Sequence, residues 1–291
     1  MITKCYFAIS AFLFTILLFT AIPAQKLSAE ELRDKHLQSI AKKEKLAELK
    51  NILATGTVKY KVLRQGGVGA DGRIVLASDG DKSLVAMNFP ISTYPSDKFI
   101  FDGRKVKIDF AYNNIRSYLG DFLYRYDDIV RDGLLGGVLS TVWPLHQKDS
   151  TKFRLDVEGR KTIDGREMIA ARYAKKGGSD VEIRVYFDPV TFSHLRTEYR
   201  RTISSQIGSI TGAQGASAAD ASIRVRELRQ ILVEEFRDFK EESGYNLPHT
   251  YRVYVLLDDM QGTREYEWVT TVNEFYINQP LDGSVFNTSD N

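Results

Sequence analysis

The residue types that most often carry out catalysis are few in this sequence, and their spacing matches no catalytic or metal-binding pattern. The chain has four histidines, none of them in an HxH or HExxH arrangement: His36, His146, His194 and His249. Its one cysteine is Cys5, so the rest of the chain offers no thiolate ligand or nucleophile. The serine motif G-x-S-x-G is absent. We therefore expect a protein that is not an enzyme and that binds neither a metal nor a cofactor.

Pairs of adjacent acidic residues are the remaining candidates for acid–base chemistry. They are Asp127-Asp128, Glu234-Glu235, Glu241-Glu242 and Asp258-Asp259. Neighbouring residues on a strand point to opposite faces, so such a pair does not bring two carboxyl groups together. We interpret all of these pairs as solvated surface.

Composition and charge exclude several classes of protein. Of 291 residues, 43% are hydrophobic and 27% are charged, which is typical of a globular chain and not of a disordered or collagen-like one. The 40 basic and 38 acidic residues give a net charge of +2. A nucleic-acid-binding protein would show a basic excess, so we expect no nucleic-acid partner.

Residues 1–24 have the order of a secretory signal peptide. Lys4 supplies a positive charge, residues 5–22 are apolar and uncharged, and Ala24 offers a small residue for cleavage. The apolar run is also near the lower limit for a membrane span, so a retained inner-membrane anchor is the alternative. In either case we expect residues 25–291 in the periplasm, an oxidising compartment that a cysteine-free mature chain suits.

From Thr55 onward the hydrophobic pattern has a period of two, which indicates strands with one apolar and one wet face. Short gaps with turn pairs such as Asp79-Gly80 favour antiparallel hairpins. We predict a mainly β (α+β) fold with a single strongly curved antiparallel sheet. It would be a half-open barrel of about 11–12 strands, because an open sheet of that width does not stay flat. Residues 25–291 would then form a single domain.

Two segments with helical spacing would cover the concave, apolar face of this sheet. The first is a helix over 29–53, which begins at the capping box of Ser28 and Glu31 and ends at Gly56. The second is the stretch 115–145, whose last part carries no charge and whose apolar spacing predicts a buried helix.

Glycines interrupt the second segment and admit two interpretations. Gly133, Gly136 and Gly137 would each cost a helix about 1 kcal/mol, so they indicate a hinge or a close approach of two backbones. The segment 115–145 is then either core filler or a mobile plug or lid over an apolar cavity. A third segment, 204–222, is rich in small residues and predicts a flexible hairpin loop.

The apolar faces of the predicted strands carry many aromatic side chains, and the segment 115–145 adds further apolar ones. The candidates for lining a hydrophobic cavity between sheet and helices are Tyr60, Phe89, Phe99, Phe101, Leu139, Trp143, Phe153, Leu155, Tyr266 and Trp268. Ordinary core packing is the alternative interpretation of these aromatic residues.

The C-terminal residues resemble a known family. Gly244-Tyr245-Asn246-Leu247-Pro248-His249 precedes one strand, and a later strand runs into Phe275-Tyr276-Ile277-Asn278-Gln279-Pro280-Leu281, with Phe286 shortly after. A long late strand followed by F-x-I-N-x-P-L is similar to the LolA/LolB-type periplasmic lipoprotein carriers and related outer-membrane lipoprotein-sorting proteins. The resemblance implies a half-open antiparallel barrel that is closed by helices over a cavity for acyl chains.

The sequence therefore favours a non-catalytic periplasmic carrier or binder of lipid or acylated protein, with the acyl chain held in a hydrophobic cavity. Its partners would be a lipid or the acyl chain of a lipoprotein, together with an inner- or outer-membrane protein. The alternative is an envelope regulatory or scaffold module of the same fold that acts through a protein partner. A hydrolase whose catalytic triad is assembled only in space is a third hypothesis.

Overall fold

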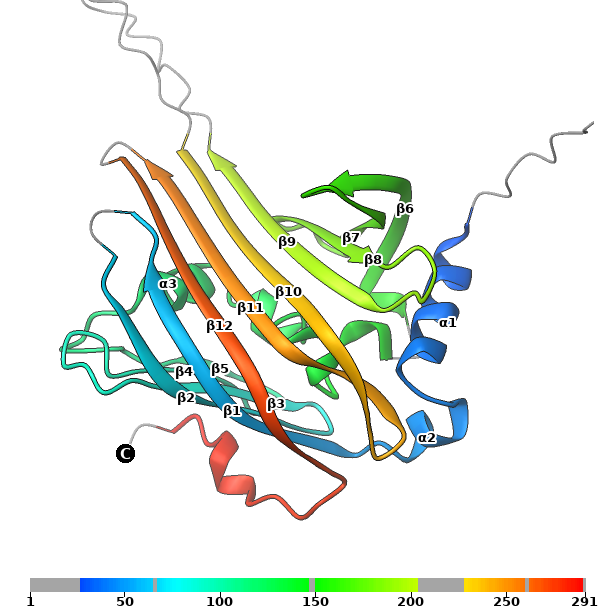
Figure 1. The fold of residues 1–291 in the computed structure, drawn as a ribbon, viewed down its shortest axis with the longest axis horizontal. Coiled ribbons are helices and arrows are strands. Elements are labelled where there is room, and N and C mark those ends of the chain that lie inside the picture. Colours follow the sequence, from blue (N-terminus) through cyan, green and yellow to red (C-terminus); the bar gives the residue numbers. More distant parts are fainter. Residues whose placement is uncertain (1–26, 65–66, 147–149, 204–227, 260–261, 290–291) are drawn as a thin grey trace, which may run out of the picture.

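One curved sheet dominates the computed structural model, which describes residues 27–64, 67–146, 150–203, 228–259 and 262–289 (Figure 1). Its 12 strands lie in the order β5-β4-β3-β2-β1-β12-β11-β10-β9-β8-β7-β6, and neighbouring strands are antiparallel. The edge strands β5 and β6 do not pair with each other, so the sheet does not close. This confirms the predicted mainly β, half-open architecture.

Strands β1–β5 form one half of the sheet and strands β6–β12 the other, and the two halves meet where β1 pairs with β12. The strands are β1 (Asn51–Val62), β2 (Gly69–Asp79), β3 (Lys82–Asn88), β4 (Ser96–Phe101), β5 (Val106–Ile108), β6 (Phe153–Ile163), β7 (Arg166–Lys175), β8 (Glu182–Phe187), β9 (His194–Ile203), β10 (Leu228–Glu242), β11 (Tyr245–Asp259) and β12 (Gly262–Ile277). The first half ends at one edge and the second half begins at the other. The residues between β5 and β6 must therefore cross from edge to edge.

Alternation along the strands separates an apolar concave face from a charged convex face. On β11, Tyr251, Val253 and Val255 are buried, while the residues between them are partly exposed. Ion pairs link neighbouring strands on the convex face, among them Arg172–Asp156 at 2.8 Å and Arg252–Glu267 at 2.6 Å. The concave face must be covered because burial of its apolar side chains is the main source of stability.

The N-terminal helix is shorter than the sequence pattern predicts. The helix α1 (Ala29–Ile40) begins as expected, with the Ser28 hydroxyl accepting a hydrogen bond from the amide of Glu31 at 3.1 Å. A short second helix, α2 (Lys43–Glu48), follows, and β1 already begins at Asn51. The prediction of one helix up to Leu53 is wrong because pairing with β2 and β12 overrides the helical spacing of the last leucines.

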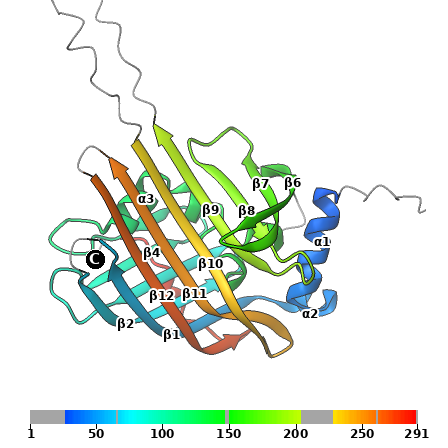
Figure 2. The ribbon, with the colours of Figure 1, turned by 45° about the horizontal axis from the view of Figure 1, so that its top comes forward.

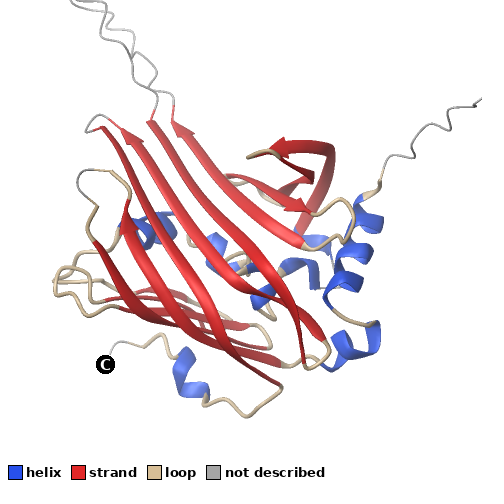
Figure 3. Ribbon diagram, in the orientation of Figure 1, coloured by secondary structure: helices blue, strands red, loops and turns tan. Residues whose placement is uncertain are grey.

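The crossing segment is also less helical than predicted (Figure 3). It holds the helices α3 (Tyr118–Arg125) and α4 (Asp128–Arg131), and then only the single turns η1 (Gly137–Leu139) and η2 (Pro144–His146). Gly133, Gly136 and Gly137 have positive φ angles of 73°, 81° and 48°, which a helix does not accept. The predicted buried helix over 134–145 is therefore an irregular chain, although it is buried as expected.

Two further elements complete the described chain. A turn, η3 (Ser150–Lys152), leads into β6, while α1 and α2 lie at the β6 end of the sheet (Figure 2). The C-terminal turn η5 (Gly283–Phe286) packs on the outside of the sheet, where Phe286 contacts a small cluster of Ala77, Leu84 and Ile100. The tail thus covers an apolar strip that would otherwise face water.

Parts of the sequence-based interpretation fall outside the described residues. The predicted signal or anchor, 1–24, and the predicted hairpin loop, 204–222, both do so. Within the described ranges, we find no helix that combines the length and the apolar character needed to traverse a bilayer.

A substitution at Gly56 tests the pairing register of β1 and β12 at the centre of the sheet. It lies where the pairing of β1 with β12 shifts, and a Cβ atom there would stand 2.2 Å from the carbonyl oxygen of Thr271. We expect Gly56→Ala to lower the free energy of unfolding by about 1–3 kcal/mol because the two central strands must move apart. Urea unfolding measures this change.

The matched control is Gly283→Ala, since a Cβ atom at Gly283 would meet nothing within 4 Å. An unfolding curve of Gly56→Ala that coincides with that of the control would contradict the described register.

Candidate functional site

The hollow of the curved sheet is filled by the second half of the crossing segment. We call residues 126–146 the plug. Between residues 134 and 143 its apolar side chains are almost fully buried, with exposures of 6% or less: Leu134, Leu135, Val138, Leu139, Val142 and Trp143. All of these except Val142 belong to one continuous core cluster, to which every strand of the sheet contributes.

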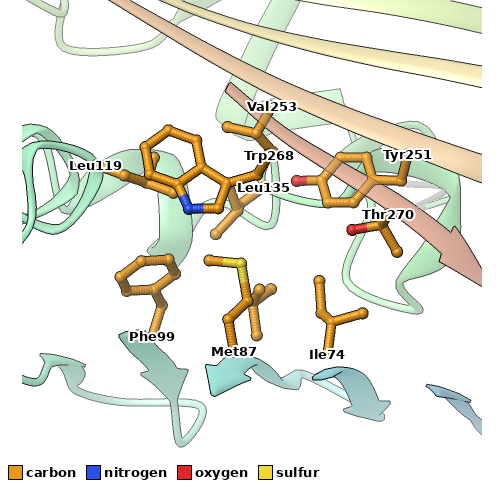
Figure 4. Close-up of a pocket in the computed structure, with 10 residues that line it drawn as sticks. Ile74, Met87, Phe99, Leu119, Leu135, Tyr251, Val253, Trp268 and Thr270 are labelled. Carbon is orange, nitrogen blue, oxygen red and sulfur yellow. The ribbon is translucent and has the colours of Figure 1, made fainter. Parts of the chain in front are cut away.

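Side chains from the sheet and the crossing segment meet around one small cavity of about 10 Å³ (Figure 4). Its walls are Ile74, Val85, Met87, Phe99, Leu119, Leu135, Tyr251, Val253, Trp268 and Thr270. Ligand pockets usually enclose about 300–1,000 Å³. The cavity that these residues enclose is therefore too small for a ligand, because side chains of the crossing segment pack into the hollow. That a larger hydrophobic cavity forms stays a prediction.

The structure brings the predicted lining residues into one buried cluster, but at different places. Tyr60, Phe89, Tyr266 and Trp268 form an aromatic group together with Tyr94, with ring centroids 5.3 Å apart between Tyr60 and Trp268. Phe99 lies on the cavity wall, and Phe101 is buried on the same strand. That these residues touch a ligand stays a prediction.

The other predicted lining residues belong to the plug and to the far edge of the sheet. Leu139 and Trp143 are plug residues, and the Trp143 ring stacks on His194 at 4.6 Å. Phe153 stacks on Tyr173 at 4.8 Å, and Leu155 is buried two residues further along β6.

Two of the three glycines predicted as a hinge approach their neighbours closely in the filled hollow. A Cβ atom on Gly133 would lie 2.0 Å from the carbonyl oxygen of Val142, and one on Gly137 would lie 2.8 Å from the rings of His194 and Phe236. Gly136 has more space but a φ of 81°. A close approach of two backbones, one of the two interpretations of these glycines, is therefore present at Gly133, while hinge motion stays a prediction.

The centre of the plug is attached to the sheet by a buried carboxylate. Glu234 on β10 is fully buried, and its Oε1 accepts hydrogen bonds from the amide of Gly136 at 2.7 Å and from the hydroxyl of Tyr251 at 2.6 Å. Its Oε2 accepts a third from the hydroxyl of Tyr199 at 2.6 Å. Burial raises the pKa of Glu234, although these three hydrogen bonds act in the opposite direction.

The prediction that Glu234 and Glu235 are both solvated is wrong. Glu235 lies on the convex face in ion pairs with Arg196 at 2.8 Å and Arg252 at 3.3 Å, and it is 5% exposed. The sequence did carry a usable signal. Adjacent residues on a strand point to opposite faces, so one acid of a pair on a one-faced strand must point into the core.

Two buried histidines hold the end of the plug next to α1. The indole Nε1 of Trp143 donates a hydrogen bond to Nε2 of His36 at 3.1 Å, so the Nδ1 of His36 carries the proton and donates to the carbonyl oxygen of Phe192 at 3.1 Å. Burial lowers the pKa of His36 to about 3 and that of His194 well below its usual range. Both imidazoles are therefore neutral at pH 7.

A second buried acid fixes the start of α3 beside the aromatic group. Asp97 on β4 accepts hydrogen bonds from the hydroxyls of Tyr94 at 2.5 Å and Ser117, the N-cap of α3, at 2.7 Å. Tyr94 in turn accepts one from the indole of Trp268 at 2.9 Å. Burial raises the pKa of Asp97 to about 7, while the hydrogen bonds from Tyr94 and Ser117 act against this shift.

Among the described residues, no cluster of three or more histidine, cysteine, aspartate or glutamate side chains could hold a metal ion. What the arrangement does is to fasten an irregular segment to an apolar wall through a few buried hydrogen bonds.

We expect the stability to depend on pH through Asp97. Its pKa is raised above the unfolded value of 3.8, so its contribution to the free energy of unfolding is fully present below pH 3.8 and is lost as the pH rises toward 7. Between these pH values the titration of this carboxyl lowers the free energy of unfolding by at most about 1.4 kcal/mol per pH unit. Asp97→Asn should remove that slope in unfolding curves recorded from pH 4 to 8, whereas Asp71→Asn on the exposed surface should keep it.

A second prediction concerns the attachment of the plug. Glu234→Ala leaves the buried amide of Gly136 and two tyrosine hydroxyls without an acceptor, and each such loss costs about 1–3 kcal/mol. We therefore expect a free energy of unfolding at least about 2 kcal/mol below that of the wild type. Glu241→Ala, on the exposed end of the same strand, should change it little. Equal losses in the two variants would contradict the role given to Glu234.

Comparisons with known proteins find similar folds but no close relative. No protein-family model matches the sequence, and no curated protein matches it. Among solved structures, an outer membrane lipoprotein-sorting protein domain from Vibrio parahaemolyticus is 12% identical and covers 89% of this chain and 97% of its own, with a TM-score of 0.43.

Two further matches are of the same kind. A LolA superfamily protein from Nitrosomonas europaea is 10% identical, with 90% of this chain and 98% of that one covered and a TM-score of 0.45. A DUF1329 family protein from Desulfovibrio piger is 9% identical, with 89% and 97% covered and a TM-score of 0.42. The similar structures thus include the group that the C-terminal motif resembles.

Proposed function

We propose that the protein is a periplasmic, non-catalytic carrier or binder of lipid or acylated protein, and that its ligand takes the place of the plug. The observation that carries this proposal is the difference between the concave face of the sheet and the plug that fills it. All twelve strands contribute buried apolar side chains to the concave face. The plug is an irregular chain whose centre is attached to the sheet through Glu234. The plug is not part of the strand pairing, so its displacement would leave the sheet intact.

The energetics of the exchange favour reversible binding. An acyl chain gains about 0.8 kcal/mol for each CH₂ group that it buries, so a chain of about 14 such groups gains about 11 kcal/mol. If residues 134–143 leave the hollow completely, each of their six buried apolar side chains loses about 1.5–3 kcal/mol. The two sums are of similar size, so the ligand and the plug would compete on nearly equal terms.

The small size of the cavity sets a condition on this function. A space of about 10 Å³ accepts no acyl chain, so binding has to be coupled to displacement of the plug. The region around the plug contains groups that favour such a change, since Glu234 and His194 are ionisable side chains buried at a cost in free energy. Both become easier to solvate when the plug leaves.

The filled hollow also favours a second function, a regulatory or scaffold module that acts through a protein partner. In that case the plug is a permanent part of the core, and the outer surface of the molecule binds the protein partner. The two functions make opposite predictions for a plug that is locked in place.

A disulfide between plug and sheet distinguishes the two functions. The amide of Thr141 donates to the hydroxyl of Ser78 at 2.9 Å, which places these residues side by side. We expect Ser78→Cys with Thr141→Cys, in a Cys5→Ser background, to bind a fluorescent fatty acid when reduced and not when oxidised. The same protein is its own control, because a reductant should restore binding. Native mass spectrometry of protein from the periplasm reports bound lipid independently.

Uptake of the fatty acid by the oxidised form as fast as by the reduced form would contradict the displacement of the plug. Absence of uptake by the wild type, with one stoichiometric protein and no lipid recovered from the periplasm, would favour the scaffold function instead.

A further inference from the structure

Exposed hydrophobic side chains gather at one place on the surface, on α3 and on the residues that precede it. Ten large hydrophobic side chains are exposed in the described part of the chain, and five of them lie between residues 110 and 124. They are Phe110, Tyr112, Ile115, Tyr118 and Tyr124, with exposures of 41–66%, and we call them the exposed patch. Single exposed apolar residues are ordinary, whereas a group of them marks an interaction surface.

One arginine connects members of the exposed patch. The guanidinium carbon of Arg116 lies 4.3 Å from the ring centroid of Phe110 and 3.7 Å from that of Tyr124. Tyr112 and Ile115 pair with each other across the turn that precedes Arg116. The patch therefore has a cation that lies among its aromatic rings.

The same surface continues onto the centre of the sheet. Tyr118, the first residue of α3, stacks on Tyr266 of β12 with the ring centroids 4.5 Å apart. The amide of Leu63 donates to the carbonyl oxygen of Glu265 at 2.9 Å, which places this exposed leucine beside the same part of β12. The start of α3 and the neighbouring ends of β1 and β12 thus lie at one end of the molecule (Figure 1).

The helix α3 has one exposed and one buried side. Tyr118 and Tyr124 are exposed, whereas Phe122 is buried and Leu119 lies on the wall of the small cavity. The helix ends at Arg125, and the plug begins at the next residue. A partner on the exposed patch therefore contacts the element that leads directly into the plug.

The charges in this stretch leave one cation over. Residues 107–125 contain two acids, and each pairs with a cation of the same stretch: Asp109 with Lys107 at 3.6 Å and Asp121 with Arg125 at 2.8 Å. Arg116 has no carboxylate partner within the described ranges, and its guanidinium lies on two aromatic rings instead. The exposed patch is thus aromatic, apolar and positively charged.

We propose that the exposed patch docks the protein on the surface of a lipid bilayer that contains anionic phospholipid. Tyrosine side chains favour the boundary between headgroups and acyl chains, and apolar side chains beside them enter the acyl region. An arginine at that depth keeps its stem on apolar groups and its guanidinium at the headgroup phosphates. The unpaired charge of Arg116 also disfavours a second copy of this chain as the occupant, because its patch carries the same charge.

Docking goes beyond the proposed function and does not depend on it, since a scaffold module would use the same surface. If the protein does carry lipid, docking brings the start of the plug next to the membrane from which a ligand comes. Uptake of the ligand and displacement of the plug would then take place at the bilayer surface.

A fluorescent label on the exposed patch tests this proposal. We expect a label on Ile115→Cys, in a Cys5→Ser background, to lose emission on vesicles of phosphatidylethanolamine and phosphatidylglycerol that carry a nitroxide-labelled lipid. The matched control is the same label on Val190→Cys, because Val190 is 81% exposed and lies in the turn after β8, outside the patch. Emission of the control should stay unchanged. Each label reports its own surroundings, so vesicle binding through another part of the chain does not produce this difference.

Unlabelled variants separate the apolar from the charged contribution in vesicle sedimentation. We expect Ile115→Ser to weaken binding to the same vesicles about tenfold, whereas Val190→Ser should bind as the wild type does. Arg116→Gln should weaken it about fivefold, the effect of one cation at an anionic surface. On vesicles of phosphatidylcholine alone, which have no net charge, Arg116→Gln should bind as the wild type does.

Equal quenching of the two labels, or no quenching at residue 115, would overturn the proposal. So would shielding of the label at residue 115 that rises with protein concentration in the absence of vesicles, because the patch would then bind a second copy. A wild type that docks on vesicles but takes up no fatty acid would refute the proposed function and leave docking in place. A wild type that takes up fatty acid while the label at residue 115 stays unquenched would have the opposite meaning.

Discussion

The apolar concave face of an open sheet cannot be left in contact with water, and this constraint determines the rest of the molecule. Twelve one-faced strands create more apolar surface than the two N-terminal helices can cover. The chain solves the problem through its topology, because the link between the two edge strands has to cross the hollow. The residues of that link supply the missing cover, and the interior becomes full.

The surface behind this cover carries several buried polar groups. Glu234 accepts three hydrogen bonds inside an apolar hollow and has no cation beside it among the described residues. A well-packed apolar residue would usually serve stability better at such a position. A carboxylate specifies one position of the plug, since only a donor at Gly136 completes its bonding, and it weakens the closed state at the same time. Both properties suit a segment that has to return to one place after it moves.

The sheet could be predicted from the sequence because alternation is a local signal. Phe153, Leu155 and Val157 on β6 show it within a few residues, and the 12 strands of the sheet agree with the predicted number of about 11–12. The plug could not be predicted in detail. Its apolar spacing suits a helix, yet Gly137 approaches the rings of His194 and Phe236, which are distant in sequence. Leu53 likewise joins a strand because of partners on β2 and β12. Glu234 was missed because acids were assigned to the surface, although alternation required one of the adjacent pair to face inward.

The central claim is that an acyl ligand and the plug exclude each other from one hollow. The most direct measurement is hydrogen exchange of the backbone amides of residues 134–139, with and without saturating palmitate. If ligand and plug exclude each other, bound palmitate speeds exchange at these amides and leaves the amides of β10 and β11 protected. Unchanged or slower exchange in the plug, at a palmitate concentration where binding is complete, would contradict it.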